Sequence, residues 1–257
     1  MIGCLFSGWA LFVNAHEYWV SPSAYTLEAS DRLIVNLRNG EDFKGNFLPF
    51  NPPTTARFEV HAKEGSAKLG KTIGDKPASS VIGLPDGLVT VLYQSKNEAI
   101  TYDDEMKFRK FAAAHDFSNL LGADKMKLPI KEKYFRYAKM LVSVGSGAGS
   151  DRAYGLEYEL IALTNPYIPA GRETMTFELR YQGSLVSNRQ VEIFEKPVGT
   201  NSDTKETQLQ TDANGRLKFQ VKPGFEYLVN SVLLRKATEK ADWVSHWASA
   251  TFAIPAL

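Results

Sequence analysis

Residues 175–181, MTFELRY, alternate strictly between apolar and polar side chains. Successive side chains of a β-strand point to opposite faces of the sheet, so this pattern predicts a strand with one buried face. The face expected to be buried carries Met175, Phe177, Leu179 and Tyr181.

The same period recurs on both sides of this stretch. Leu33, Val35 and Leu37 occupy alternate positions before the turn signal Asn39-Gly40. Further strands are predicted at 57–62, 89–93, 134–144 and 154–163, and again at 191–193, 217–221, 227–234 and 250–254. Many short segments with this period, separated by turn signals, predict a mainly β protein.

One segment departs from the strand pattern. DDEMKFRKFAAA, residues 103–114, places Met106, Phe108 and Phe111 at mixed helical spacing. Three acidic residues stand at its start, where they suit the positive end of a helix dipole. We therefore expect one short helix near 103–114 inserted in a β domain, with a second turn near 117–121.

The best internal boundary is NPYIPAG, residues 165–171, where two prolines and a glycine interrupt the strands. About ninety residues follow it, a natural size for a β-sandwich. We therefore predict a mainly β fold with two domains. The first, 16–164, is an N-terminal β-sandwich-like domain with the inserted helix, and the second, 165–257, is a C-terminal immunoglobulin-like β-sandwich.

The first fifteen residues, MIGCLFSGWALFVNA, carry no charge. An apolar run of secretory length ends in Val13-Asn14-Ala15, which predicts a signal peptide over 1–15 that is cleaved after Ala15. The missing basic residue before the run leaves open a start inside a longer leader, and a short buried strand is the alternative. We expect an exported, periplasmic protein whose mature chain has no transmembrane segment.

Composition excludes several classes of function. The 30 Lys+Arg and 29 Asp+Glu give a net charge of +1, so we expect no nucleic-acid partner. The only cysteine, Cys4, lies in the leader, which excludes disulfides, thiolate catalysis and cysteine-held metal clusters from the mature chain. The catalytic motifs GxSxG and HExxH and the Walker A motif are absent, and we expect no enzyme activity.

Six stretches together resemble one bacterial family: HEYWVSP (16–22), LRNGEDFKGNFLPF (37–50), KYFRYAKMLVSVG (133–145), NPYIPAGRETMTFELRYQGSLVSNRQVEIF (165–194), TDANGRLKF (211–219) and ADWVSHWASATF (241–252). It is a periplasmic family of unknown function labelled as a nickel-uptake or cobalt/nickel ABC-transport periplasmic component. The C-terminal half is also similar to the carboxypeptidase-regulatory type of immunoglobulin-like module. The resemblance covers nearly the whole mature chain and implies a part in metal uptake.

Cleavage after Ala15 would make His16 the first residue, with a free α-amine beside its imidazole. The amine and Nδ1 can chelate one Ni(II) or Cu(II) ion, both of which favour nitrogen ligands. Two ligands do not make a tight site, so others must come from the fold. The remaining imidazoles are His61, His115 and His246. We place the candidate metal site at His16, with His246 as a second candidate ligand.

Each of the other imidazoles also has a structural interpretation. His61 falls on the polar face of its strand, where a solvated surface side chain is the simpler reading. His115 follows the predicted helix and suits the negative end of its dipole. His246 lies between two tryptophans and fits a packed or hydrogen-bonded side chain. Carboxylates able to supply oxygen ligands near the terminus are Glu17, Glu41 and Asp42.

Three hypotheses for the function remain open. In the first, the protein is a metal-binding accessory that helps nickel, cobalt or copper uptake or delivery, with the metal ion and a membrane transport component as partners. In the second, it is a non-enzymatic envelope module that binds a protein or glycan partner. A third, a copper-dependent oxidant, requires a second imidazole beside His16, from His61 or His246.

Overall fold

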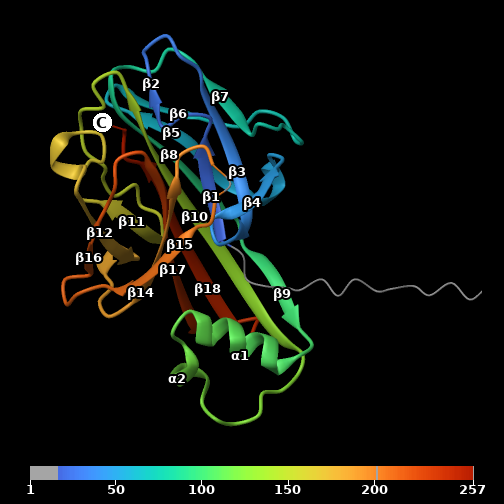
Figure 1. The fold of residues 1–257 in the computed structure, drawn as a ribbon. Coiled ribbons are helices and arrows are strands. Elements are labelled where there is room, and N and C mark those ends of the chain that lie inside the picture. Colours follow the sequence, from blue (N-terminus) through green and yellow to red (C-terminus); the bar gives the residue numbers. More distant parts are fainter. Residues whose placement is uncertain (1–16, 201, 257) are drawn as a thin grey trace, which may run out of the picture.

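The computed structural model describes residues 17–200 and 202–256. Three β-sheets form most of this part of the chain, and two short α-helices lie together at one end (Figure 1). The mainly β fold with a short helix is therefore confirmed. The predicted signal peptide and His16 lie outside the described residues.

The largest sheet has ten strands and draws on most of the chain. Its path is β15-β14-β17-β18-β10-β8-β5-β6, and β2 and β9 also pair with β10. Its strands are β2 (Thr26–Leu27), β5 (Thr55–Ala62), β6 (Gly65–Lys68), β8 (Gly87–Ser95), β9 (Glu98–Tyr102), β10 (Ile130–Val144), β14 (Gln190–Pro197), β15 (Lys205–Gln210), β17 (Phe225–Lys236) and β18 (Trp243–Ala253).

Two four-stranded sheets accompany the large one. The first contains β1 (Glu17–Pro22), β3 (Leu33–Glu41), β4 (Lys44–Leu48) and β7 (Ser79–Val81), and the second contains β11 (Tyr158–Ala162), β12 (Thr174–Tyr181), β13 (Ser184–Leu185) and β16 (Arg216–Gln220). Strand β1 packs directly against β18 of the large sheet, because the hydroxyls of Ser249 and Thr251 on β18 donate to the carbonyl oxygens of Tyr18 and Val20 at 2.7 and 2.6 Å.

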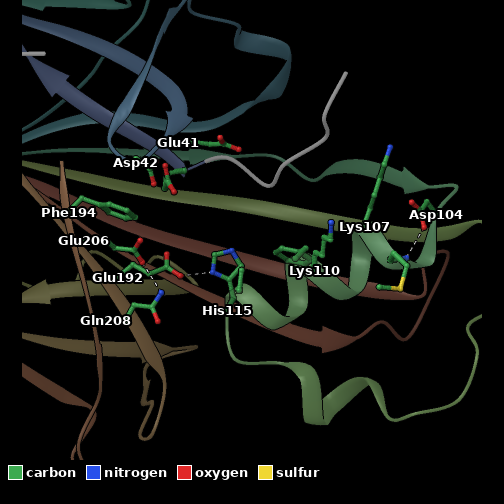
Figure 2. A pocket seen from close by; sticks show the side chains of 14 residues that line it. Glu41, Asp42, Asp104, Lys107, Lys110, His115, Glu192, Phe194, Glu206 and Gln208 are labelled. Carbon is green, nitrogen blue, oxygen red and sulfur yellow. Dashed lines mark hydrogen bonds and ion pairs between the residues drawn. The ribbon is translucent and has the colours of Figure 1, made fainter. Parts of the chain in front are cut away.

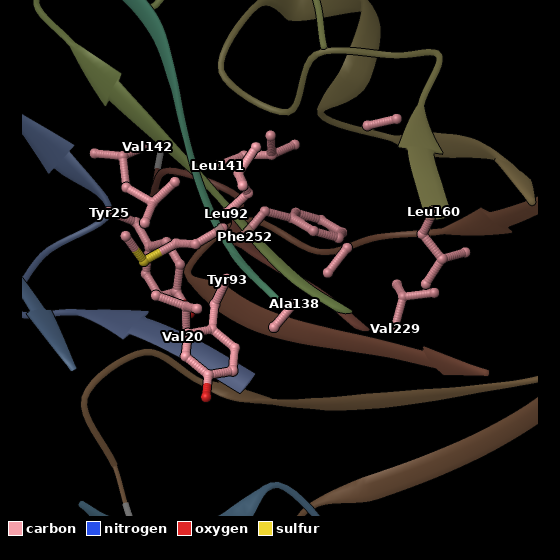
Figure 3. Close-up of a cluster of buried hydrophobic side chains, with 14 of the residues drawn as sticks. Val20, Tyr25, Leu92, Tyr93, Ala138, Leu141, Val142, Leu160, Val229 and Phe252 are labelled. Atoms are coloured by element: carbon pink, nitrogen blue, oxygen red, sulfur yellow. The ribbon is translucent and has the colours of Figure 1, made fainter. Parts of the chain in front are cut away.

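The main core lies between the large sheet and its two smaller neighbours. Val20 on β1, Val142 on β10, Leu160 on β11 and Phe252 on β18 are at most 1% exposed and belong to one cluster (Figure 3). Burying each such side chain contributes about 1.5–3 kcal/mol. The sheets therefore form stacked, sandwich-like layers over a shared apolar interior.

The central pairing of the large sheet is parallel and joins segments far apart in sequence. Strands β10 and β18 pair from Glu132↔Trp243 to Met140↔Thr251. Strands from both sides of residue 165 thus share one sheet. The boundary between 16–164 and 165–257 stays a prediction, as does the immunoglobulin-like assignment of the second segment.

Helix α1 (Glu105–Ala114) lies within the predicted range 103–114, and α2 (Ser118–Leu121) follows it. The Asp104 carboxylate caps α1 by accepting a hydrogen bond from the Met106 amide at 2.8 Å. Phe108 is fully buried and packs against Trp243, with ring centroids 5.5 Å apart. The helix is thus held by an end cap and by an apolar face on β18.

Several predicted strands differ in length from those observed. Strand β18 begins at Trp243, seven residues before the predicted start at 250, and β14 extends to Pro197, four residues beyond the predicted end at 193. Strand β10 begins at Ile130, four residues before the predicted start. Strand β11 covers only Tyr158–Ala162 of the predicted 154–163. The Glu159 carboxylate explains the shorter β11, because it accepts hydrogen bonds from the Tyr154 and Leu156 amides and so occupies two donors that a strand partner would need.

No helix within the described ranges is long and apolar enough to cross a membrane.

Candidate functional site

A pocket of about 530 Å³ lies between helix α1, the start of β1 and the neighbouring strands β14 and β15 (Figure 2). Acidic residues outnumber lysines six to two among its lining residues, so its charge favours a cation. The lining residues are Glu17, Glu41, Asp42, Asp104, Met106, Lys107, Lys110, Phe111, Ala114, His115, Glu192, Phe194, Glu206 and Gln208.

Glu17 is the first described residue of the chain and opens strand β1, where it pairs with Gly40 on β3. The residue is only 9% exposed, and its buried oxygen Oε2 has no hydrogen-bond partner among the described residues. Burial and then the nearby carboxylates of Glu192 and Asp42 raise the pKa of Glu17 to about 8. An unpaired carboxylate in such a place is costly unless a proton or a metal cation neutralises it.

Glu192 on β14 and His115 after α1 are hydrogen-bonded across the pocket, with His115 Nδ1 and Glu192 Oε1 2.6 Å apart. The other oxygen of Glu192 accepts a hydrogen bond from the Asn230 side chain at 2.7 Å. Burial alone would raise the pKa of Glu192, but the hydrogen bond and charge of His115 together with Asn230 and Gln190 lower it. Glu192 is therefore a fixed carboxylate that orients the His115 ring.

Aromatic side chains hold the His115 ring in this position. Its centroid lies 5.4 Å from the Phe111 ring and 5.1 Å from the Trp247 ring, both in edge-on arrangements. His115 is the C-terminal cap residue of α1, as the sequence predicts for its place in the chain. Its side chain has a second role that the sequence did not indicate, because it bridges the helix to β14.

The β3–β4 turn forms another wall of the pocket and is anchored to β14. Asp42 and Phe43 have positive φ angles of 53° and 58°, as a tight turn requires. The buried Lys196 ammonium donates to the Phe43 carbonyl oxygen at 2.9 Å, and the Phe43 ring packs edge-on against Trp19 at 5.5 Å. These contacts fix the Asp42 side of the pocket relative to Glu192.

The side chains that line the pocket supply only some of the ligands that a transition-metal ion needs. Among residues 17–200 and 202–256, no three His, Cys, Asp or Glu side chains are grouped so that they could hold a metal ion. The pocket supplies carboxylates and one imidazole, with the unpaired Glu17 oxygen directly after position 16 in the chain. A metal site here therefore needs the amine and imidazole that the sequence predicts for a cleaved His16.

His246, the second predicted ligand, lies in a different environment. Its ring stacks on Phe135 with centroids 5.4 Å apart, and its Nδ1 is 3.2 Å from the Tyr137 hydroxyl. Burial lowers the pKa of His246, an effect that Glu157 opposes and Arg235 reinforces. The structural interpretation of His246, a packed and hydrogen-bonded side chain, matches these contacts. Its role as a ligand stays a prediction.

His61 differs from the solvated side chain that its strand position predicts. Its side chain is only 11% exposed, because Nε2 contacts the Glu59 carboxylate at 2.9 Å and the ring packs on Tyr154 at 4.6 Å. The prediction was wrong because alternation along one strand does not reveal a neighbouring segment that covers its polar face.

Glu192 is one of the pocket residues that sequence reasoning missed, along with Phe194, Glu206 and Gln208. Its only sequence signal is a carboxylate between Val191 and Ile193, in a strand whose residues 191–196 are all buried. A charged residue in such a strand must find a partner. That signal indicates an ion pair but does not identify His115, which lies 77 residues away in the sequence.

Residues 13–233 match a family described as a domain of unknown function, DUF4198, and the chain belongs to that family. No curated protein matches the chain. The family assignment covers both small sheets and most of the large one, and it carries no activity with it.

Several solved structures show weak similarity. Trypsin-activated α2-macroglobulin from Escherichia coli is 10% identical with a TM-score of 0.23, and the match covers 93% of this chain but only 15% of that one. The D0–D1 domain of intimin is 15% identical, covering 91% and 97% of the two chains, with a TM-score of 0.22. The adhesin InvE of Yersinia pseudotuberculosis is 15% identical, covering 91% and 58%, with a TM-score of 0.23. The fold assignment rests on the sheets described above.

Proposed function

We propose that the protein is an exported periplasmic accessory protein that binds a divalent transition-metal ion, nickel, cobalt or copper, in the pocket beside Glu17. In this proposal the ion is cargo for uptake or delivery, a membrane transport component is the partner, and the protein catalyses no reaction. The proposal rests on one observation above all. The Glu17 carboxylate is buried in an acidic pocket, and its Oε2 has no hydrogen-bond partner among the described residues.

The predicted mature terminus supplies what the pocket lacks. The α-amine and imidazole of His16 would form a chelate ring on one ion, because nickel, cobalt and copper all accept nitrogen ligands. Glu17, the next residue, would add an oxygen ligand. His115 is held by Glu192 through Nδ1, so its Nε2 is the nitrogen left to face a ligand.

The proposal is tested on protein purified from the periplasm. Intact mass first establishes whether the chain begins at His16, and calorimetric titration with nickel, cobalt and copper then gives the affinities. We expect micromolar or tighter binding that is lost in His16→Ala, in Glu17→Gln and on adding one residue before His16. The added residue removes the terminal amine from its place but leaves every pocket side chain intact.

A matched control comes from a second histidine–carboxylate pair. His61 contacts Glu59 at 2.9 Å, much as His115 contacts Glu192 at 2.6 Å, but neither His61 nor Glu59 lines the pocket. We expect His115→Ala to weaken metal binding and His61→Ala to leave it unchanged. Equal effects of the two variants, or binding that ignores changes at His16, would refute the proposed site. No binding of any metal would favour the alternative, an envelope module that recognises a protein or glycan.

A further inference from the structure

A second cluster, remote from the pocket lining, consists of one lysine and two carboxylates. Lys139 on β10 is 1% exposed, although it is charged and lies in the centre of the large sheet. Its Nζ contacts Asp151 Oδ2 at 2.7 Å, the Arg152 carbonyl oxygen at 3.1 Å and Glu159 Oε1 at 3.3 Å. The side chains of Lys139, Asp151 and Glu159 are each 2% exposed.

The two carboxylates are held differently. Glu159 accepts backbone hydrogen bonds from Tyr154 at 2.8 Å and from Leu156 at 3.2 Å, so both of its oxygens are satisfied. Oδ2 of Asp151 accepts a hydrogen bond from the Ala162 amide at 2.9 Å, but the buried Oδ1 has no hydrogen-bond partner among the described residues. Asp151 is therefore the carboxyl group of this cluster that keeps a buried oxygen without a hydrogen bond.

The charges in this cluster do not balance when all three groups are ionised. One ammonium faces two carboxylates, in a place that water does not reach. Moving one proton from Lys139 to Asp151 leaves the net charge unchanged and produces a neutral amine beside a neutral carboxylic acid. Those two forms are the reactants of amide formation, and Glu159 remains a carboxylate next to the amine.

We propose that Lys139 and Asp151 become joined by an intramolecular isopeptide bond, with Glu159 as the proton carrier. The amine Nζ attacks Cγ of Asp151, and Glu159 takes a proton from the nitrogen. Glu159 then returns this proton to the departing carboxyl oxygen, the C–O bond breaks, and one water molecule leaves. No oxidant, reductant or cofactor is needed, and Glu159 ends as it began.

The fold makes this condensation favourable where free side chains in water would not react. Contact at 2.7 Å replaces a bimolecular encounter, which contributes a large effective concentration. The enclosed position favours expulsion of water and prevents its return. The product amide also replaces an ammonium and a carboxylate, which removes two buried charges and leaves Glu159 paired with its backbone donors.

The proposed bond has an unambiguous signature in a tryptic digest. Trypsin cleaves after Arg136 and Arg152, and it cleaves after Lys139 only while that amine is free. A linked protein yields one peptide, residues 137–152, lighter than its sequence by one water. An unlinked protein yields two peptides, 137–139 and 140–152, and this result in protein purified from the periplasm would overturn the proposal.

The digest also separates the bond from a simpler dehydration of Asp151. A succinimide at Asp151 loses the same water but leaves Lys139 free, so peptide 140–152 would carry the mass loss. That outcome also overturns the proposal. Because the digest is read on denatured wild-type protein, the result does not depend on whether any variant folds.

Variants assign the roles of the three residues. Lys139→Arg keeps a buried cation but lacks the lysine amine. This variant should therefore have the full mass of its sequence, without the loss of one water. Glu159→Gln should leave the peptides unlinked, and bond formation in this variant would refute its role as proton carrier. Asp151→Asn should still react but should lose ammonia in place of water, because its leaving group is then the amide nitrogen. Circular dichroism of each variant shows whether the fold is retained.

Discussion

Replacing Glu17 with glutamine removes a carboxyl group whose pKa rises from the ordinary 4.5 to about 8 on folding, chiefly through burial. Glutamine has nearly the same shape and carries no charge. A carboxyl with a raised pKa binds its proton more tightly in the folded chain than in the unfolded one. Its contribution to stability is therefore complete below about pH 4.5 and is lost as the pH rises towards 8.

The size of the effect follows from these two pKa values. At about 1.4 kcal/mol for each pH unit, keeping Glu17 protonated in the folded chain costs roughly 3 kcal/mol at pH 7. Once the pH exceeds 8, the cost approaches about 5 kcal/mol, which corresponds to the full difference between the pKa values of 4.5 and about 8. Glu17→Gln avoids this cost, so the variant should be the more stable protein at neutral and alkaline pH.

Urea denaturation followed by tryptophan fluorescence, with a metal chelator present, measures the free energy of unfolding at several pH values. The advantage of Glu17→Gln over the wild type should grow by roughly 3–4 kcal/mol between pH 5 and pH 8. Any effect of the glutamine side chain on stability that does not depend on pH cancels, because only the change in the advantage with pH is compared. The exposed Glu64→Gln is the matched control and should show no such growth.

An advantage of Glu17→Gln that stays constant across the pH range would refute the reasoning, since it would show that Glu17 ionises normally in the folded chain. The same experiment connects stability to the proposed metal site. Saturating metal should remove the part of the wild type's pH dependence that comes from Glu17, because the ion would neutralise the Glu17 carboxylate, and should leave Glu17→Gln unchanged.

Two further predictions concern other buried groups. Burial lowers the pKa of His246, with Glu157 opposing and Arg235 reinforcing the effect, so this histidine destabilises the fold as the pH drops below about 6.5. His246→Phe should therefore lose less stability than the wild type in urea titrations between pH 7 and pH 5, and equal losses would contradict the assignment. Phe108→Ala should reduce the free energy of unfolding by about 3–5 kcal/mol, because the ring is fully buried under α1. Met106→Ala, on the same helix but 58% exposed, should change it by less than about 0.5 kcal/mol, and similar values for the two variants would show that α1 does not pack as described.

The elements that the sequence predicts well are those whose signals are local. Strand β12 follows from the alternation in residues 175–181, because a half-buried strand needs one apolar face. Helix α1 follows from its spacing and from the acidic residues at its start, where Asp104 provides the cap. In both cases the deciding interactions lie within a few residues of one another.

The pocket depends on contacts that no local signal specifies. His115 belongs to the end of a helix, and Glu192 lies in the middle of a strand 77 residues later. Glu17 was recognised as a possible ligand because it adjoins the predicted terminus, but its burial depends on which strands cover it. The alternation of apolar and polar residues identifies which face of a strand is buried, but it does not identify the segments that pack against that face.

The amino-acid sequence alone thus determined a mainly β protein with a short helix, whereas the leader and the metal ligand at position 16 stay predictions. Only the tertiary structure decided that β10 and β18 pair in parallel, and that Lys139, Asp151 and Glu159 meet with side chains only 2% exposed. The physical reason is the same for both. Secondary structure depends on neighbouring residues, whereas the energy of a buried charge depends on whatever the rest of the chain places around it.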